Sequence, residues 1–598
     1  MKILDKHTYS SGIIGNCSFL AYISKNTEVE WLCWPMFDSS FIFGSLLDRD
    51  KGGSFRIIPE DRDAIFEQKY EENTNIIRTK VTCHDGTFLV TDFAPRFFEG
   101  ETHYKPLIFL RKIEPIEDSP KINVVCDPRD SYGSFLPKAS IASNHILFSG
   151  LGSDLRLTTN ISLHYILRNT SFVLNETKYL VLSYGDHLEN PSERKVQDLL
   201  DRTREYWRNW VKHCSIGEFQ QEAVIRSALA LKLHQFQDTG AIIASGTTSL
   251  PESPSSGRNW DYRYCWIRDA YYTLSALNGI GHFEEMEHYS HFLENIASTK
   301  RERIQPLFSI LGEEILEEKI LDLDGYLGNK PVRIGNQAFT HIQNDVYGQI
   351  LLSIMPLYLD ARFHKKSKSS SGESILNLLK HIERTMDEPD AGLWEFRNLQ
   401  QKHCYTFLFH WAGSAAAEKI GEKLNDREIC DLAVFLKERS ALNIEACYDK
   451  KRGVYTQAEG SEHLDASLLQ LISLGYLKED PEKANRHLAV LESELKTKEG
   501  LFFRYKHNDD FGAPKTAFLV CAFWYVDALA CVGRLEEAKE YFLNLLTYTN
   551  HLGLFSEDVD PANGSQWGNF PQAYSHVGLM NSAFRISRKM DIPLFLCP

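Results

Sequence analysis

The feature that most restricts the fold of this 598-residue chain is a regular alternation in the lengths of the segments that join its predicted helices. From residue 219 onwards, apolar periodicity and capping residues predict twelve helices. They fall near 219–237, 268–279, 283–298, 343–363, 372–386, 404–424, 427–448, 465–477, 481–496, 515–533, 534–550 and 571–590. Long Gly-rich segments precede every second helix, beginning with the second, and short segments precede the others.

This alternation predicts that the long segments share one face, because every second connection in an antiparallel array of helices lies at the same end. Six helical hairpins can form an open solenoid or a closed double ring. A solenoid predicts a sequence repeat of about 34–45 residues, whereas these hairpins share a length pattern and no residues. We therefore expect residues 219–598 to form a closed (α/α)6 barrel, with functional residues on the long loops around one mouth.

Residues 1–187 follow a different pattern, in which short β-rich runs alternate with turn residues. Such runs are typical of an antiparallel β-sandwich. They are EVEWLCW, GSFRIIP, NIIRTKVTC, GTFLVTDFAP, KPLIFLRKIEPI, INVVCD, HILFSG, LRLTTNISLHYIL and KYLVLSYG. Residues 188–218 return to helical periodicity and are predicted to form a helical linker. The predicted fold class is thus multidomain, an N-terminal antiparallel β-sandwich followed by an (α/α)6 barrel catalytic domain.

Charge and cysteine usage exclude several classes of partner. The net charge is −15, which argues against a nucleic-acid binder, gives no support to binding of an anionic membrane surface, and is compatible with a neutral ligand. The N-terminus lacks the apolar core of a signal peptide, and no run reaches the length of a membrane span. The 12 Cys are scattered without paired or His-containing clusters. We expect reduced thiols, a cytoplasmic location, no metal and no cofactor; the oligomeric state is left open.

The first long loop has the composition of a carbohydrate-binding segment. NWDYRYCWIRDA places Trp260, Asp261, Trp266, Arg268 and Asp269 within ten positions. Aromatic rings stack on the C–H faces of sugars, and Arg/Asp pairs hold hydroxyl groups in fixed directions. A simpler alternative is that Asp269 only caps the following helix.

In the second long loop, a group of polar residues close to a helix start is open to the same two explanations, capping or substrate contact. The group is Asn336, Gln337, Gln343 and Asp345.

Two other long loops each carry one carboxylate after an apolar approach. Glu395 lies between Trp394 and Phe396 in DEPDAGLWEF, and Glu557 follows GLFS. In a closed ring these loops face one mouth, and two opposed carboxyl groups are the minimal machinery for glycoside hydrolysis. Burial beside its aromatic neighbours is expected to raise the pKa of Glu395, so that it can donate a proton. The remaining acids of that stretch, Asp387, Glu388 and Asp390, are expected to be turn and surface charges.

An ordered set of motifs resembles glycoside hydrolase family 15, the glucoamylase-like enzymes. These motifs are SLPE, NWDYRYCWIRDA, PVRIGNQA, QNDVYG, GLWEFR, FLVCAFWYVDAL and GNFPQAYSH, and the N-terminal IIGNCSFLAYISKNTEVEWLCWPMFDSS is similar to the β-sandwich of bacterial members. The resemblance covers roughly 590 residues. It implies an inverting enzyme in which Glu395 is the general acid and Glu557 the general base. It also implies that Trp266, Arg268 and Asp269 hold the terminal glucose and that Trp394 lines the same subsite. The full set of predicted substrate-binding residues is Trp260, Asp261, Trp266, Arg268, Asp269, Asn336, Trp394, Arg397 and Gln572.

The resemblance leaves the substrate divided between two candidates. Fungal glucoamylases carry a second Glu where this chain has Phe396, followed by Arg397, whereas trehalases occur among bacterial and archaeal members with an Arg here. The leading prediction is an exo-acting α-glucoside hydrolase that releases β-D-glucose from non-reducing ends of α-linked gluco-oligosaccharides. The alternative is an α,α-trehalase on the same scaffold. A lower alternative is a non-catalytic sugar-binding regulatory protein.

Overall fold

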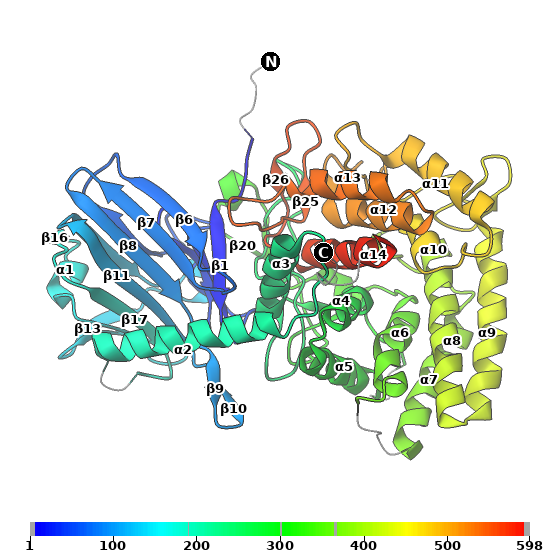
Figure 1. Cartoon of the computed structure of the whole chain (residues 1–598), viewed down its shortest axis with the longest axis horizontal. Coiled ribbons are helices and arrows are strands. Elements are labelled where there is room, and N and C mark those ends of the chain that lie inside the picture. The colour runs from blue at the N-terminus through cyan, green and yellow to red at the C-terminus, as the bar shows by residue number, and fades with distance from the viewer. Residues whose placement is uncertain (1–5, 189–190, 299–301, 364–367, 591–598) are drawn as a thin grey trace, which may run out of the picture.

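The computed structural model describes residues 6–188, 191–298, 302–363 and 368–590. It consists of a β-sandwich and a helical barrel that lie side by side, with the long helix α2 (Glu193–Lys212) running below the sandwich to the edge of the barrel (Figure 1). The N-terminal antiparallel β-sandwich and the (α/α)6 barrel predicted from the sequence are both present. Among the described residues, no helix is long and apolar enough to cross a membrane.

Two antiparallel sheets form the sandwich. One has the strand order β1-β2-β3-β5-β12-β16, with β4 paired to β3, and the other has the order β13-β14-β15-β17-β11-β8-β7-β6. The strands of the first sheet are β1 (Ser11–Gly15), β2 (Leu20–Ser24), β3 (Val29–Cys33), β4 (Phe41–Phe43), β5 (Ser54–Pro59), β12 (Lys121–Asp127) and β16 (Phe172–Val173). Those of the second are β6 (Ile65–Tyr70), β7 (Ile77–Cys83), β8 (Gly86–Phe93), β11 (Ile108–Asp118), β13 (Lys138–Ile141), β14 (His145–Ser149), β15 (Leu155–Thr159) and β17 (Lys178–Tyr184).

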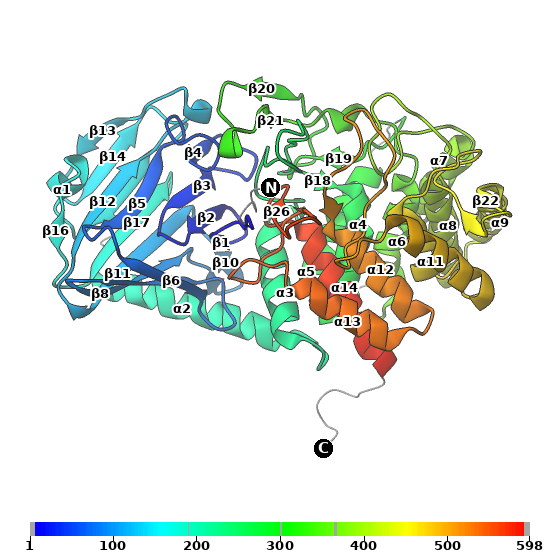
Figure 2. The same cartoon turned by 90° about the horizontal axis from the view of Figure 1, so that it is seen from above.

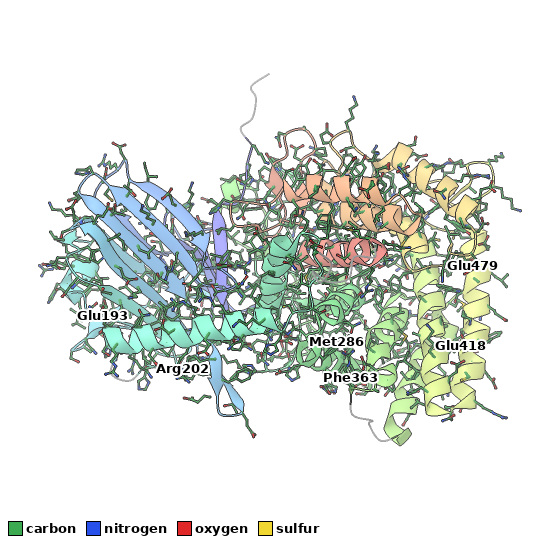
Figure 3. The ribbon with its side chains drawn as sticks, viewed as in Figure 1. Glu193, Arg202, Met286, Phe363, Glu418 and Glu479 are labelled. Carbon is green, nitrogen blue, oxygen red and sulfur yellow. The ribbon has the colours of Figure 1, made fainter. Side chains whose placement is uncertain are left out.

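The sandwich core lies between the two sheets and is built from alternating apolar side chains, such as Phe55 and Ile57 in β5 and Phe109 in β11. A separate hairpin of β9 (Phe97–Glu99) and β10 (Thr102–Tyr104) reaches α2. Arg202 of α2, labelled in Figure 3, lies over the ring of Phe97 at 3.6 Å from its centroid. This contact fastens the linker helix to the sandwich.

One predicted strand is wrong in part. LRLTTNISLHYIL divides into β15 and the short helix α1 (Leu163–Leu167). The Asn160 side chain accepts a hydrogen bond from the backbone N–H of Tyr179, which ends the strand ladder, and a helical turn then buries Leu163 and Ile166 together. Alternating residues would instead have pointed one of these two side chains to solvent.

All twelve predicted helices of the barrel are present. They are α3 (Gln221–His234), α4 (Ile267–Ile280), α5 (Phe283–Ser298), α6 (Val346–Leu359), α7 (Lys368–Thr385), α8 (Cys404–Leu424), α9 (Arg427–Ala446), α10 (Gln470–Ser473), α11 (Pro481–Leu495), α12 (Leu519–Cys531), α13 (Leu535–Leu546) and α14 (Ala573–Met590). The eighth is shorter than expected, since a 3-10 turn, η4 (Ala466–Leu469), takes up its first half.

Every second helix belongs to an inner ring. In this ring α4 packs on α6, α6 on α8, α8 on η4, α10 on α12, α12 on α14, and α14 returns to α4. The other helices lie outside, so each short loop joins an inner helix to an outer one (Figure 1). The long loops consequently gather at one end of the ring, the upper side of the barrel in Figure 2, and this end holds the site.

Small two- and three-stranded sheets stiffen the long loops, together with short 3-10 turns. They are β18 (Cys265–Trp266) with β19 (Leu307–Phe308), β20 (Lys319–Leu321) with β21 (Val332–Ile334), β22 (Tyr448–Asp449) with β23 (Val454–Tyr455), and β24 (Ala517–Phe518) with β25 (Asp558–Val559) and β26 (Gln566–Trp567). The 3-10 turns of these loops are η2 (Tyr326–Gly328) and η3 (Gln337–Thr340), whereas η1 (Ser131–Gly133) lies in the sandwich. Loops paired in this way hold functional side chains in fixed positions.

The cysteine thiols of the described residues are all free, as the sequence predicts.

Candidate active site

A cavity opens at the end of the barrel where the long loops meet. Five of the six long loops contribute to its wall, and the inner helices α12 and α14 supply Trp524 and Tyr574. The space between the lining side chains is about 790 Å³, including solvent at the opening. The sixth long loop supports the wall from behind, because Asp465 accepts a 3.0 Å hydrogen bond from the indole N–H of Trp394.

Glu395 is held in an unusual backbone conformation in the loop between α7 and α8. Its φ is +61°, in the left-handed region that costs a non-Gly residue about 1–3 kcal/mol. The preceding turn fixes this conformation, since the backbone N–H groups of Glu395 and Phe396 donate to Gly392 and Ala391. The indole N–H of Trp266 then donates to Glu395 Oε1 at 2.8 Å, so the carboxylate is held toward the cavity that it lines.

The predicted rise in the pKa of Glu395 is wrong. Burial does raise this pKa, but the Arg268 guanidinium, with its Nη1 3.2 Å from Oε1, His341 and the Trp266 N–H together lower it more. The net result is a pKa below the ordinary value for Glu. Arg268 lies 127 positions away in the sequence, so the neighbours of Glu395 along the chain gave no sign of its charge.

The prediction for Asp390 is also wrong. This acid is buried, and its carboxylate accepts hydrogen bonds from the backbone N–H groups of Asn344 and Gly392 and from the hydroxyl of Thr406. It therefore ties the loop of Glu395 to the loop before α6. Asp387 and Glu388, in contrast, are surface charges that form ion pairs with arginines.

Glu557 is buried in the loop between α13 and α14. The Tyr262 hydroxyl donates to Oε1 at 2.8 Å, and the backbone N–H of Asn569 donates to Oε2 at 3.1 Å. Burial, followed by the charges of Asp558 and Glu252, raises the pKa of Glu557 well above its ordinary value. Glu395 and Glu557 thus have opposite electrostatic surroundings.

A pair of aromatic rings connects the two carboxyl groups. Tyr262, which donates to Glu557, meets Trp266, which donates to Glu395, edge to face with ring centroids 5.2 Å apart. Both carboxylates line the same cavity. A bound ligand that contacts one of them is therefore close to the other.

The structure separates the predicted substrate-binding residues into two groups. Those that line the cavity are Trp260, Arg268, Asn336, Trp394 and Arg397. Those that lie behind it are Asp261, Trp266, Asp269 and Gln572.

Two of the residues behind the cavity have clear structural partners. Asp261 is fully buried in a two-pronged ion pair with Arg263 and faces away from the cavity. Asp269 lies 3.7 Å from Arg268, and burial raises its pKa to about 7. Asp269 does not cap α4, because the N-cap position belongs to Trp266.

Several cavity residues were not predicted as site residues. Glu252 forms ion pairs with Arg258 and Arg504 beneath Trp260, and His341 faces Glu395. Glu252 belongs to the SLPE motif, which gave a sequence signal for it. Arg504 follows a run of ordinary loop residues, and only the closing of the ring brings it to Glu252.

A short segment at the protein surface forms part of the cavity wall. We call residues 509–511, from the loop between α11 and α12, the strap. Within it, Asp510 accepts hydrogen bonds from the backbone N–H of Arg397 at 2.6 Å and from the Asn398 amide at 2.7 Å. Phe511 meets Trp260 edge to face at 5.2 Å. The strap thereby joins the loop of Glu395 to the first long loop.

Two carboxylates that face one cavity, with aromatic and Arg/Asp side chains around them, at the mouth of an (α/α)6 barrel define the class of this protein, which is a glycoside hydrolase. The family model described as Glycosyl hydrolases family 15 matches residues 218–584, so the chain belongs to that family. A second model, described as Trehalase-like, N-terminal, matches residues 7–149.

Relatives match both parts of the chain. A protein named Trehalase from Thermoplasma volcanium is 32% identical over 97% of this chain and 93% of its own length. A protein with the same name from Mycobacterium tuberculosis is 30% identical over 95% of this chain and 87% of its own. A solved bacterial glucoamylase complexed with acarbose matches with a TM-score of 0.67 at 15% identity, covering 97% of this chain and 95% of the other. That likeness concerns the fold.

Proposed function

We propose that this protein is an inverting α,α-trehalase. The observation that carries the choice is the set of relatives from several organisms that bear the name Trehalase and align with both the sandwich and the barrel. This replaces the leading prediction from the sequence, an enzyme that shortens gluco-oligosaccharides, by its alternative. The class, a glycoside hydrolase, is common to both.

The opening of the cavity supports a disaccharide substrate. The strap is fixed to the loop of Glu395 through Asp510, and Arg397 lies over Trp260 with 4.7 Å to the ring centroid. Arg397 also forms a 3.1 Å ion pair with Glu318. We infer that these contacts restrict the room for a third and later sugar of an oligosaccharide, whereas the two rings of trehalose do not need that room.

We assign the general acid to Glu395 and the general base to Glu557. Glu395 gives its proton to the bridging oxygen, and Glu557 takes a proton from the water that attacks the anomeric carbon from the opposite face. The glycone leaves as β-glucose and the other half as α-glucose. Arg268 favours the charged form of Glu395 in the free protein, and sugar hydroxyls that bind Arg268 would increase the protonated fraction of Glu395.

Hydrolysis of trehalose and of maltotriose tests the substrate. We expect glucose from trehalose at a rate at least roughly tenfold above that from maltotriose, and proton NMR at early times should show equal amounts of the α and β anomers. Faster glucose release from maltotriose would instead support the exo-acting hydrolase of gluco-oligosaccharides that the sequence predicted. No glucose from either sugar would favour the non-catalytic sugar-binding protein. Two α anomers from trehalose would exclude an inverting mechanism.

A substrate that needs no acid separates the two roles. Fluoride leaves α-glucosyl fluoride without protonation, so Glu395→Gln should keep most turnover on it while losing roughly 10²–10⁴-fold on trehalose. Glu557→Gln should lose activity on both. If Glu557→Gln instead kept activity on α-glucosyl fluoride and Glu395→Gln lost it, Glu557 would be the acid and Glu395 the base. Circular dichroism checks that each variant is folded.

A further inference from the structure

The N-terminal segment of the chain lies against the loop that carries Glu557. The backbone N–H of Gln566 donates to the carbonyl of His7 at 2.9 Å, and the backbone N–H of Tyr9 donates to Gln566 Oε1 at 3.0 Å. The Asn550 amide donates to the carbonyls of Tyr9 and Ser11. Residues 7–11 are therefore fixed to the loop between α13 and α14, although more than 530 positions separate them in the sequence.

Tyr9 continues from this anchor toward the carboxylate. Its side chain is buried, and its ring stacks on Phe570 with centroids 4.7 Å apart. The hydroxyl donates to the carbonyl of Gly568 at 2.8 Å. That carbonyl belongs to the same peptide group as the N–H of Asn569, which donates to Glu557 Oε2 at 3.1 Å. A hydrogen bond to a peptide carbonyl strengthens donation by the N–H of that peptide.

We propose that Tyr9 is a positioning residue for the reaction: through the peptide group between Gly568 and Asn569, it fixes and strengthens the backbone donor to Glu557. This inference rests on the proposed function, which makes Glu557 the general base. It gives the N-terminal segment a part in the reaction, since the phenol acts on the carboxylate through this peptide group from outside the barrel. Tyr9 touches no substrate and acts only through this peptide group.

The direction of the effect follows from the groups around Glu557. Tyr262 donates to its other oxygen, Asp558 and Glu252 raise its pKa by their charges, and Arg504 faces both of those acids. A donor to a carboxylate favours the ionised form. Loss of the Tyr9 hydroxyl therefore weakens the Asn569 donor and moves the pKa of Glu557 upward.

We call the path from the Tyr9 hydroxyl through the Gly568–Asn569 peptide group to Glu557 the relay. Tyr9→Phe in the full chain tests it, because Phe keeps the stacking on Phe570 and removes only the hydroxyl. We expect kcat to fall roughly two- to tenfold, the factor that one hydrogen bond represents, with KM unchanged on both trehalose and α-glucosyl fluoride. The upper break of the pH profile should move to higher pH.

Two further variants test whether the effect passes through Glu557. In a Glu557→Gln background, Tyr9→Phe should cause no further loss of kcat. Replacing Tyr9 by 3-fluorotyrosine, a stronger donor, should move the break the other way.

Tyr70→Phe is the matched control, since the Tyr70 hydroxyl donates at the same 2.8 Å distance to a backbone carbonyl, that of Ile13, without contact to the cavity. We expect wild-type kcat from it. Amide hydrogen exchange of residues 566–572 supplies a readout that needs no activity, and Asn569 should exchange faster in Tyr9→Phe alone. Equal kcat and exchange in Tyr9→Phe and wild type, or equal losses in both Phe variants, would overturn the relay. If the wild-type protein hydrolyses neither trehalose nor α-glucosyl fluoride, the proposed function is wrong. The amide hydrogen exchange of Asn569 still tests the relay in that case.

Discussion

Glu395 and Glu557 differ through the residues that the fold places beside them. Glu395 has a cation, Arg268, and an indole N–H against the same oxygen. Glu557 has two donors, but Asp558 and Glu252 surround it with negative charge. Burial penalises the charged form of both groups. The pKa order in the free protein is therefore Glu395 below Glu557, whichever of them is the acid.

The pH profile of kcat/KM reports this order, because its two breaks follow the free protein. Trp266→Phe removes the donor to Glu395, which raises that pKa, so the lower break should move up and narrow the profile. Tyr262→Phe removes the donor to Glu557, so the upper break should move up and widen it. Movement of the upper break by Trp266→Phe would place Glu395 above Glu557 and contradict the order.

Gly568 is a position where only glycine fits. Its φ is +74°, and a Cβ there would lie 2.6 Å from the Glu557 carboxylate. We expect Gly568→Ala to lose about 1–2 kcal/mol of unfolding free energy through its backbone, and most of its activity through displacement of Glu557. Gly460→Ala is the control, with a φ of +72° and no atom within 4 Å of its Cβ. Glucose release measures the activity of both variants. Equal loss of activity in the two would indicate that lower stability, and not displacement of Glu557, is the cause.

Among the helices of the inner ring, α6 and α8 approach each other closely. A Cβ on Gly348 of α6 would lie 2.0 Å from the carbonyl oxygen of Phe409 in α8, and one on Gly413 would lie 2.4 Å from the Cα of Gly348. This contact brings two neighbours of the inner ring together directly below the loops that carry Asn336 and Glu395. The width of the ring at the site depends on it.

Gly348→Ala should therefore destabilise the barrel in spite of the better helix propensity of Ala. Because backbone must move apart, we expect a loss of at least about 2 kcal/mol in urea unfolding. Gly372→Ala in α7 is the comparison, since its Cβ would have only ordinary contacts at 3.5 Å and beyond. That change should stabilise by about 0.5–1 kcal/mol. Equal effects of the two substitutions would show that the close approach is not rigid.

At the scale of the whole molecule, the sandwich and the barrel share buried contacts. Trp31 of β3 donates its indole N–H to the carbonyl of Gly246 at 2.8 Å, and one apolar cluster runs from Trp31 and Phe41 to the inner helices. Arg263, in the first long loop, donates to the carbonyl of Ser39 and the hydroxyl of Tyr132. The first sheet and the active-site loops thus form one continuous interior.

Substitution of Arg263 tests this junction. Arg263→Leu leaves the buried Asp261 without its cation, so we expect a loss of about 3–5 kcal/mol in unfolding free energy. The double variant Asp261→Leu with Arg263→Leu should recover part of that loss, because no charge then remains buried without a partner. Chemical unfolding measures both, and a single variant as stable as the wild type would show that the pair does not join the two parts.

The sequence by itself determined the layers of this protein. Helical periodicity and alternating loop lengths are local properties, and they predicted the twelve barrel helices and the face that carries the cavity. The β-rich runs predicted the sandwich, although the early strands β1 and β2, with glycine and serine among their residues, were missed. The motifs named Glu395 and Glu557, and the structure places both on the same cavity.

Tertiary structure alone decided the charges and the supports of the site. The pKa of Glu395 depends on Arg268, that of Glu557 on Glu252, and the burial of Asp261 on Arg263 in a junction with the sandwich. Electrostatic interactions act through space and change with burial, so residue order gives no measure of them. The contact from Tyr9 to the loop of Glu557 has the same origin: it exists only because the folded sandwich brings the start of the chain to the mouth of the barrel.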